Sequence, residues 1–376
     1  MPRKAKSKTN PNRKPKGSPV RVRNPFRRDK VKSAPKIKKD LVKEYTEAIK
    51  TEGVVKVLNL ADTDCLSNVK SYISTQSLEL DKLLNGLGIP TGRVTEIYGP
   101  PHVGKSTLLD HLFASVQKKG GIGILADTEG ARDSRYSRSI GVDLEALCYL
   151  EFERTELHIE NIIMRIYQTV EFWHEKAPDL PVVIGWDALG GTATKDELEK
   201  RLEKDSRVAG AAQILRTACR QLPTKLGNTN IAVVICNHEY ENINTTKFGK
   251  KRETYGGAAV RHLASIRLQL YNLGYIKTTG GEIVGRETGA KLVKNRLGRA
   301  WKETSFALLS GIGIDNLWSI FTRLSEAKII EKKGSWSAIN LDGEIIKFQG
   351  WTGLQEKCVE DETLFPRLTA VYLSLA

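Results

Sequence analysis

The stretch that decides the fold runs from Val94 to Thr107 and reads VTEIYGPPHVGKST. A short apolar strand is followed by the pattern G-x-x-x-x-G-K-[ST], and a helix is expected to continue to about Lys118. Between a strand and a helix, this pattern wraps backbone N–H groups around a phosphate. A purely structural glycine-rich turn would not need lysine and serine at its end. The residues predicted to contact a nucleotide are Gly99, Pro100, Pro101, His102, Val103, Gly104, Lys105, Ser106 and Thr107.

Two acidic strand ends add to the predicted chemistry of this loop. We expect Lys105 to place its charge beside the β- and γ-phosphates and Ser106 to offer a hydroxyl to Mg²⁺. Asp187 ends a buried apolar strand, where an acid typically completes such a magnesium site, although it could instead cap a helix. Glu129 follows the second strand and can orient and deprotonate an attacking water, or lie in a loop as an ordinary surface residue. Spacing alone does not decide between these two interpretations of Glu129.

The order of the expected elements predicts an α/β fold. Early alternation of strands and helices, including helices over 155–175 and 195–222, indicates a mostly parallel sheet flanked by helices. Later clustered strands add an antiparallel section, and a helix over 316–328 precedes a hairpin around Trp336. We expect four parts, namely a basic arm over 1–39, an amphipathic helix with a linker over 40–71, a core over 72–315 and a small α+β domain over 316–376.

The basic arm carries the whole net charge of +15, because residues 1–39 hold 16 Lys or Arg and one acid, Asp29. The arm is poor in large apolar groups and cannot bury a core, so we expect it to be disordered. Attraction to nucleic-acid phosphate is one interpretation of the arm, and a solubilising or localisation tail is the other. The sequence contains no apolar run long enough to span a bilayer, and five scattered cysteines are typical of a reducing cytosol. We therefore expect a cytoplasmic protein with no membrane partner.

A polar, basic stretch from Glu239 to Gly257 also contains Ile243 and Phe248. It is too polar for a core, so it is a functional loop or a disordered insert. Cations next to exposed apolar groups suit DNA, where charges meet phosphates and apolar wedges enter base steps. The cations are Lys247, Lys250, Lys251 and Arg252.

From about Ser74 to Leu375 the chain resembles the RecA/RadA-type homologous recombinases, and within them the bacterial and phage branch. The matching motifs are GRVTEIYGP over 92–100, GVD over 141–143, YGGA over 255–258, VKNR over 293–296 and IIEKKGSW over 329–336. The last three are not needed by a generic phosphate-loop ATPase. The resemblance implies a RecA-like ATPase core, an N-terminal polymerisation helix over 40–53 and a C-terminal domain that gathers duplex DNA.

The resemblance also implies roles for individual residues. Glu129 matches the catalytic glutamate, Asp187 the second magnesium acid, and Asp133 and Tyr136 the adenine contacts. Lys294 and Arg296 match a basic pair that reaches the ATP of the neighbouring subunit. Two loops, over 205–213 and 239–255, match the DNA-binding loops. The residues implied to contact DNA are Arg207, Val208, Gln213, Arg220, Ile243, Phe248, Lys250, Lys251, Arg252, Gly256 and Gly257.

The chain departs from the family pattern at several positions. His238 stands where the family has a glutamine that senses the γ-phosphate, and an imidazole titrates whereas an amide does not. His262 replaces an interface aromatic, and Ala188 replaces a serine after Asp187. Both DNA loops are about one residue longer than in the family, the usual acidic tail is missing and the basic arm is extra.

The resemblance implies an ATP- and Mg²⁺-using, DNA-dependent ATPase. Such a protein forms a homo-oligomeric filament on single-stranded DNA, engages double-stranded DNA and exchanges strands, in the nucleoid or in the cytoplasm of a phage-infected host. Two other classes stay open. One is a hexameric helicase or motor of the same fold, and the other is a non-enzymatic filament protein that only senses ATP.

Overall fold

The computed structural model describes residues 65–199, 209–241, 252–278 and 280–375. The basic arm and the expected polymerisation helix lie outside these ranges, as do residues 205–208 of the first expected DNA loop and residues 242–251 of the second. No helix among the described residues is both long and apolar enough to cross a membrane.

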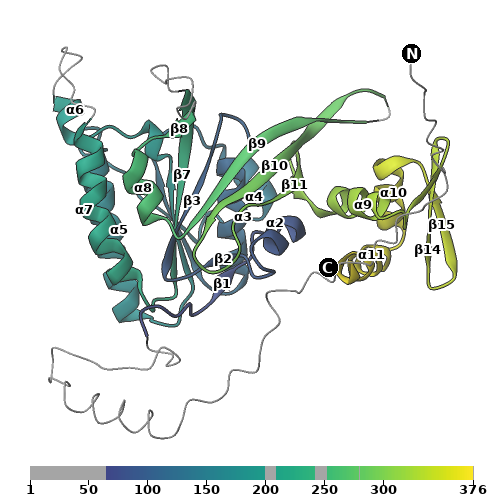
Figure 1. The fold of residues 1–376 in the computed structure, drawn as a ribbon, viewed down its shortest axis with the longest axis horizontal. Helices are drawn as coiled ribbons and strands as arrows, with labels where there is room; N and C mark the ends of the chain where they lie inside the picture. The colour runs from purple at the N-terminus through teal and green to yellow at the C-terminus, as the bar shows by residue number, and fades with distance from the viewer. Residues whose placement is uncertain (1–64, 200–208, 242–251, 279, 376) are drawn as a thin grey trace, which may run out of the picture. The chain divides into compact units, whose positions relative to one another are not determined.

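A ten-stranded sheet forms the centre of the core, with strands in the order β12-β11-β10-β9-β3-β7-β6-β4-β5 and β8 paired to β7 (Figure 1). The strands from β9 to β5 in this order run parallel, whereas β9 to β12 pair antiparallel. The predicted fold class, a mostly parallel sheet with an added antiparallel section, is therefore confirmed. The strands are β3 Arg93–Gly99, β4 Ile122–Asp127, β5 Leu147–Tyr149, β6 Val182–Asp187, β7 Ile231–Glu241, β8 Arg252–Thr254, β9 Ile266–Lys277, β10 Ile283–Asn295, β11 Lys302–Leu309 and β12 Gly313–Asp315.

Helices cover both faces of this sheet (Figure 1). Neighbouring strand residues point to opposite faces, so Val183 packs in the cluster with α3, and Ile184 in the cluster with α5 and α7. This burial on both faces explains why the parallel strands read as continuous apolar runs. The helices are α2 Leu78–Leu83, α3 Lys105–Lys118, α4 Ser134–Ile140, α5 Ile159–Lys176, α6 Lys195–Glu199, α7 Ala209–Leu226 and α8 Gly257–Leu263, together with a 3₁₀ turn, η1 Leu189–Gly191. A two-stranded sheet pairs β1 Tyr72–Ile73 with β2 Ile89–Pro90.

Several predicted boundaries were wrong. The helix expected from residue 155 begins at Ile159, where His158 accepts the N-cap hydrogen bond from the N–H of Asn161. The single helix expected over 195–222 corresponds to two helices, α6 and α7, on either side of the undescribed residues 200–208. Helix α7 also continues past Pro223. The sequence predicts strands over 265–270 and 290–293, whereas β9 and β10 extend beyond them. Their outer halves pair with each other and carry mostly exposed or half-buried side chains, which leave no buried pattern in the sequence.

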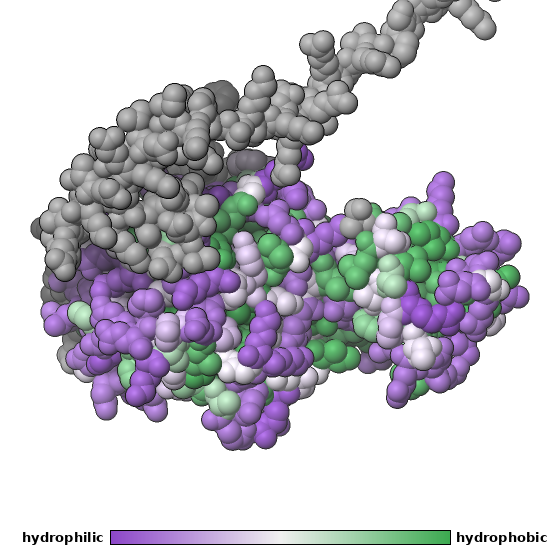
Figure 2. Space-filling view, turned by 90° about the horizontal axis from the view of Figure 1, so that it is seen from below, coloured by the Kyte–Doolittle hydropathy of each residue, from purple (hydrophilic) through white to green (hydrophobic). Residues whose placement is uncertain are grey.

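The C-terminal segment contains α9 Asn316–Glu326, β13 Glu331–Lys333, β14 Trp336–Leu341, β15 Glu344–Phe348, α10 Gly350–Glu360 and α11 Leu364–Ser374. It has an apolar cluster of its own, and the hairpin expected around Trp336 is present with a third strand. Arg323 of this segment pairs with the buried Glu79 of α2, which also accepts a 2.8 Å hydrogen bond from Tyr372. Apolar residues also reach the surface of the segment (Figure 2). The division of the chain at 71/72 and 315/316 stays a prediction.

Candidate nucleotide-binding site

The phosphate-binding loop connects the end of β3 to the start of α3. Gly104 has a left-handed backbone with φ of 94°, and a Cβ there would collide with the side chain of Leu308. A Cβ at Gly99 would collide with the carbonyl oxygen of Leu270. Both glycines of the pattern are therefore required by the conformation and the close packing of the loop.

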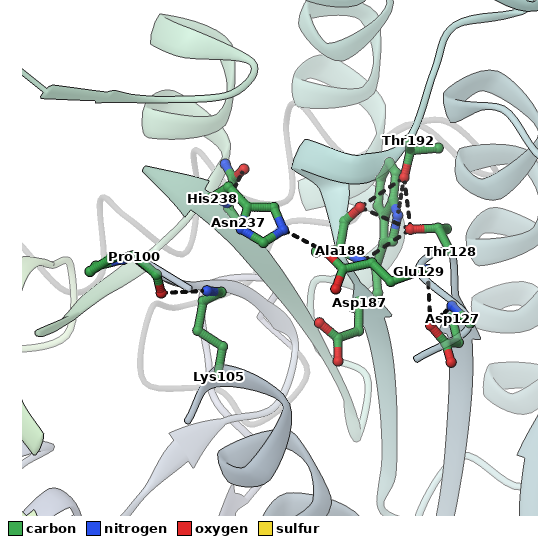
Figure 3. Close-up of polar contacts among 12 residues, drawn as sticks. Pro100, Lys105, Asp127, Thr128, Glu129, Asp187, Ala188, Thr192, Asn237 and His238 are labelled. Carbon is green, nitrogen blue, oxygen red and sulfur yellow. Dashed lines mark hydrogen bonds and ion pairs between the residues drawn. The ribbon is translucent and has the colours of Figure 1, made fainter. Parts of the chain in front are cut away.

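Lys105 is buried at the base of this loop, with a relative exposure of 6%. Its Nζ donates to the carbonyl oxygens of Pro100, at 2.9 Å, and Gly99, at 3.2 Å (Figure 3). Burial lowers the pKa of Lys105. A buried ammonium held by two neutral carbonyls is under-compensated, so the loop fits an anionic ligand such as a triphosphate. Ser106, the next residue, is exposed to the cavity beside the loop.

The acids at the ends of β4 and β6 lie side by side, because Asp127 and Asp187 are paired in the sheet register. Asp187 is buried and its Oδ2 accepts a 2.8 Å hydrogen bond from Arg132 Nη2. The Asp187 carboxylate and the Ser106 hydroxyl are oxygen donors of the kind that Mg²⁺ takes. Asp127 has another role, since its Oδ1 accepts from the backbone N–H groups of Glu129, at 3.1 Å, and Gly130, at 3.0 Å. It thus shapes the turn that carries Glu129 (Figure 3).

Glu129 and His238 are in direct contact across the edge of the sheet, with 2.5 Å between Glu129 Oε1 and His238 Nε2 (Figure 3). A glycine of η1 leaves room for His238, because a Cβ at Gly190 would lie only 2.9 Å from His238 Cδ2. Gly190 was not among the predicted site residues, although the pair GG, separated from the strand-end Asp187-Ala188 only by Leu189, was a usable signal.

A cavity of about 380 Å³ opens beside the loop. Tyr136 of α4, which is predicted to contact adenine, lines this cavity. Its hydroxyl oxygen lies 3.5 Å from the hydroxyl oxygen of Thr107. Asp133 is the N-cap of α4, where its side chain accepts from the N–H of Arg135 at 2.8 Å, and it is not among the lining residues. The opposite wall comes from the β9–β10 hairpin and was not predicted. Its residues are Tyr275, Ile283, Gly285 and Arg286, and Arg286 donates to the carbonyl oxygen of His102 in the loop.

Lys294 and Arg296 both reach the C-terminal end of α8. Lys294 Nζ donates to the carbonyl oxygen of Arg261 at 2.6 Å and lies 3.3 Å from that of His262. Arg296 Nη2 donates to the same His262 oxygen at 3.0 Å. Burial and the neighbouring Arg296 lower the pKa of Lys294 to about 8. Two cations at a helix C-terminus are favourable to the helix dipole, so within one chain the pair stabilises α8.

The described DNA-contact candidates lie on α7, at the start of β8 and at the start of α8. Gln213 and Arg220 are exposed on α7, and Arg252 begins β8, 3.8 Å from Glu239. Gly256 is the left-handed N-cap of α8, and Gly257 begins that helix with φ of 53°. The other candidates lie outside the described residues, namely Arg207, Val208, Ile243, Phe248, Lys250 and Lys251.

The sheet order and the loop define a RecA-type phosphate-loop fold. A family model described as the RecA N-terminal domain matches residues 39–315. Protein RecA of Chlorobium limicola is 33% identical over 314 residues, which are 83% of this chain and 84% of that protein. Protein RecA of Chlorobaculum parvum is 34% identical over 314 residues, 83% and 85% of the two chains. Protein RecA of Brucella canis is 33% identical over 290 residues, 77% and 76%. The chain belongs to the RecA family of recombinases.

Proposed function

We propose that this protein is a DNA-dependent ATPase that forms helical filaments on single-stranded DNA and catalyses homologous pairing and strand exchange in recombinational repair. The observation that supports this most is the arrangement at the carboxyl edge of the sheet. There the buried Lys105, the acid Asp187 and the Glu129–His238 pair come from four adjacent elements of a RecA-family fold.

Each of these residues has a defined role in the proposed reaction. Lys105 binds the phosphates of ATP, and Ser106 and Asp187 hold Mg²⁺, which when bound offsets the negative charge of the phosphates. Glu129 orients the attacking water and accepts its proton. His238 lies beside that base and responds to the γ-phosphate. Asp133 and Tyr136 are proposed to bind the adenine.

DNA binding is proposed for the two loops over 205–213 and 239–255, which are only partly described. It is also proposed for the described residues Gln213, Arg220, Arg252, Gly256 and Gly257. Asn237 connects the two sites. Its Nδ2 donates to the carbonyl oxygen of Tyr255, directly before Gly256, and its Oδ1 accepts from the N–H of His238, each at 2.9 Å. A change at His238 can therefore reach the end of the second DNA loop through one side chain.

Two further proposals concern the ends of the chain. The basic arm over 1–39 would add phosphate contacts, so its removal should flatten the dependence of DNA affinity on salt without changing ATP hydrolysis at saturating DNA. The segment over 316–376 would gather duplex DNA. A cytoplasmic location, on the nucleoid or in a phage-infected host, follows from this function.

Strand exchange between circular single-stranded DNA and a homologous linear duplex tests the proposal. The wild type should exchange strands and hydrolyse ATP only with DNA. Lys105→Ala should abolish ATP binding and hydrolysis together, whereas Glu129→Gln should keep ATP binding and lose most turnover, because only the base is removed. Near wild-type turnover by Glu129→Gln would remove Glu129 from its role. ATP binding without any hydrolysis by the wild type would favour an ATP-sensing filament protein instead.

A further inference from the structure

Arg132 joins two buried carboxylates from different parts of the core. One guanidinium nitrogen pairs with Asp110 of α3, and the other donates to Asp187 Oδ2 at the end of β6, at 2.8 Å. The side-chain exposures are 12% for Arg132, 3% for Asp110 and 8% for Asp187. Neither Arg132 nor Asp110 belongs to the phosphate-loop pattern or to the matched motifs, so the bridge is additional to the predicted site.

The bridge places a permanent cation on the carboxylate that is proposed to hold Mg²⁺. An arginine does not lose its proton in a protein, so Arg132 can give up Asp187 only by moving. Removing it altogether would leave two buried carboxylates without their shared ion-pair partner, which is strongly unfavourable. The guanidinium is also incompletely satisfied, because its Nε is buried and has no hydrogen-bond partner among the described residues.

We propose that Arg132 is an internal counter-cation of the magnesium site. It neutralises Asp187 before the nucleotide arrives and yields this carboxylate to Mg²⁺ when the metal and nucleotide bind. Asp110 keeps hold of the guanidinium during this exchange, so the charge of Arg132 stays compensated. This inference rests on the proposed function, since it assigns Mg²⁺ and ATP to the site.

The exchange also acts on the start of α4. Arg132 directly precedes Asp133, the N-cap of that helix, and Asp110 Oδ2 accepts a 2.9 Å hydrogen bond from Ser137 Oγ within it. Tyr136, which lines the cavity, lies in the same first turn. A movement of Arg132 away from Asp187 therefore acts on α4, the helix that carries Tyr136. Magnesium binding thereby becomes linked to binding of the adenine.

The test is the binding of a ribose-labelled fluorescent ATP to the full chain, titrated with Mg²⁺. In Arg132→Gln the metal no longer competes with a fixed cation, so the Mg²⁺ concentration for half-maximal nucleotide binding should fall by about tenfold, the equivalent of one charge-assisted hydrogen bond. The matched control is Arg138→Gln, which removes an exposed arginine of α4 that pairs with Glu145 and should leave the midpoint unchanged. An unchanged or raised midpoint in Arg132→Gln would overturn the proposal.

A second variant controls for Asp110, which the single substitution leaves without its ion-pair partner. Arg132→Gln/Asp110→Asn neutralises both partners and retains Asp187, and it should show the same lowered midpoint even if the single variant does not fold. A thermal shift gives an independent reading, because added Mg²⁺ without nucleotide should stabilise the double variant more than the wild type. An equal shift in both proteins would contradict the exchange. A wild type that binds no nucleotide at any Mg²⁺ concentration would overturn the proposed function together with this inference, whereas normal wild-type binding with an unmoved variant midpoint overturns this inference alone.

Discussion

His238 Nε2 lies 2.5 Å from Glu129 Oε1, and this contact joins β7 to the turn after β4. The proposed base therefore has an imidazole as its direct neighbour. A phosphate at this edge offers His238 a second acceptor, so the two anions compete for one imidazole. The adjacent Asn237 holds the carbonyl oxygen of Tyr255 at 2.9 Å. Competition at His238 can thus couple ATP to the DNA-binding side.

This arrangement predicts that the coupling of ATP to DNA depends on the His238 side chain. His238→Ala should reduce the gain in DNA affinity that ATP gives, because no side chain then reaches both Glu129 and a phosphate, whereas His238→Gln keeps a hydrogen-bond donor and should retain part of the gain. The measurement is the affinity for single-stranded DNA with and without ATP. His174→Gln, at an exposed position on α5, is the control. An equal gain in DNA affinity from ATP in the wild type and in His238→Ala would exclude this role.

Lys294 and Arg296 are predicted to act on the neighbouring subunit. Because both cap α8 within one chain, glutamines are the better substitution, since they keep donors for the Arg261 and His262 carbonyls and remove the charge. Lys294→Gln/Arg296→Gln should bind ATP normally and lose DNA-dependent hydrolysis by about a thousandfold or more, as expected for charges supplied in trans.

Mixing separates an action in trans from a structural role. Combined with Lys105→Ala, which cannot use its own site but offers intact cations, the glutamine variant should regain a fraction of the ATPase activity at hybrid interfaces. If electron microscopy shows co-assembly and no activity returns, the pair belongs to structure or to DNA contact.

Tyr275 is predicted to form the second wall of the base pocket. Its side chain is 60% exposed on β9 and lines the same cavity as Tyr136 and the phosphate loop. Tyr275→Ala should weaken ATP binding by roughly five- to a hundredfold, the range for loss of one base–aromatic stack. Calorimetry should show that Tyr275→Ala binds inorganic tripolyphosphate, which has no base, as tightly as the wild type does. Leu273→Ala, at a similarly exposed β9 position outside the cavity lining, is the control. Equal losses for both ligands would show that Tyr275 acts on the loop and not on the base.

His111 is predicted to make folding stability fall in acid. Its Nε2 accepts from the N–H of Ile314 at 2.9 Å, so Nδ1 carries the proton and faces Gln76 Oε1 at 3.1 Å. Burial lowers the pKa of His111 to about 4. The unfolded chain therefore binds more protons than the folded chain between about pH 4 and 6.5, and stability is present above that window and lost as pH falls through it.

The contribution of His111 is at most about 3 kcal/mol across this window. His111→Gln removes the titrating ring, so its free energy of unfolding should vary less with pH than that of the wild type. Denaturant unfolding at several values between pH 4.5 and 7 measures both slopes. The same slope in the two proteins would show that other groups cause the acid sensitivity.

The sequence was sufficient to predict what is local. The loop around Lys105 and the acids at strand ends were predictable, because residue type and spacing within one strand–loop–helix unit determine them. The Glu129–His238 contact and the Arg132 bridge were not, because they depend on which strands are neighbours and on ion pairs between distant segments. Tyr275 was missed for a further reason: an exposed tyrosine in a long hairpin leaves no periodic pattern, and only the fold brings it to the loop.

Electron microscopy of the full chain with single-stranded DNA and a non-hydrolysable ATP analogue tests the central claim most directly. We predict continuous helical filaments that cover the DNA for the wild type and are absent for Lys105→Ala. Closed rings of fixed size would contradict the recombinase function and favour a helicase of the same fold, and wild-type protein that stays unassembled on the DNA would contradict it as well.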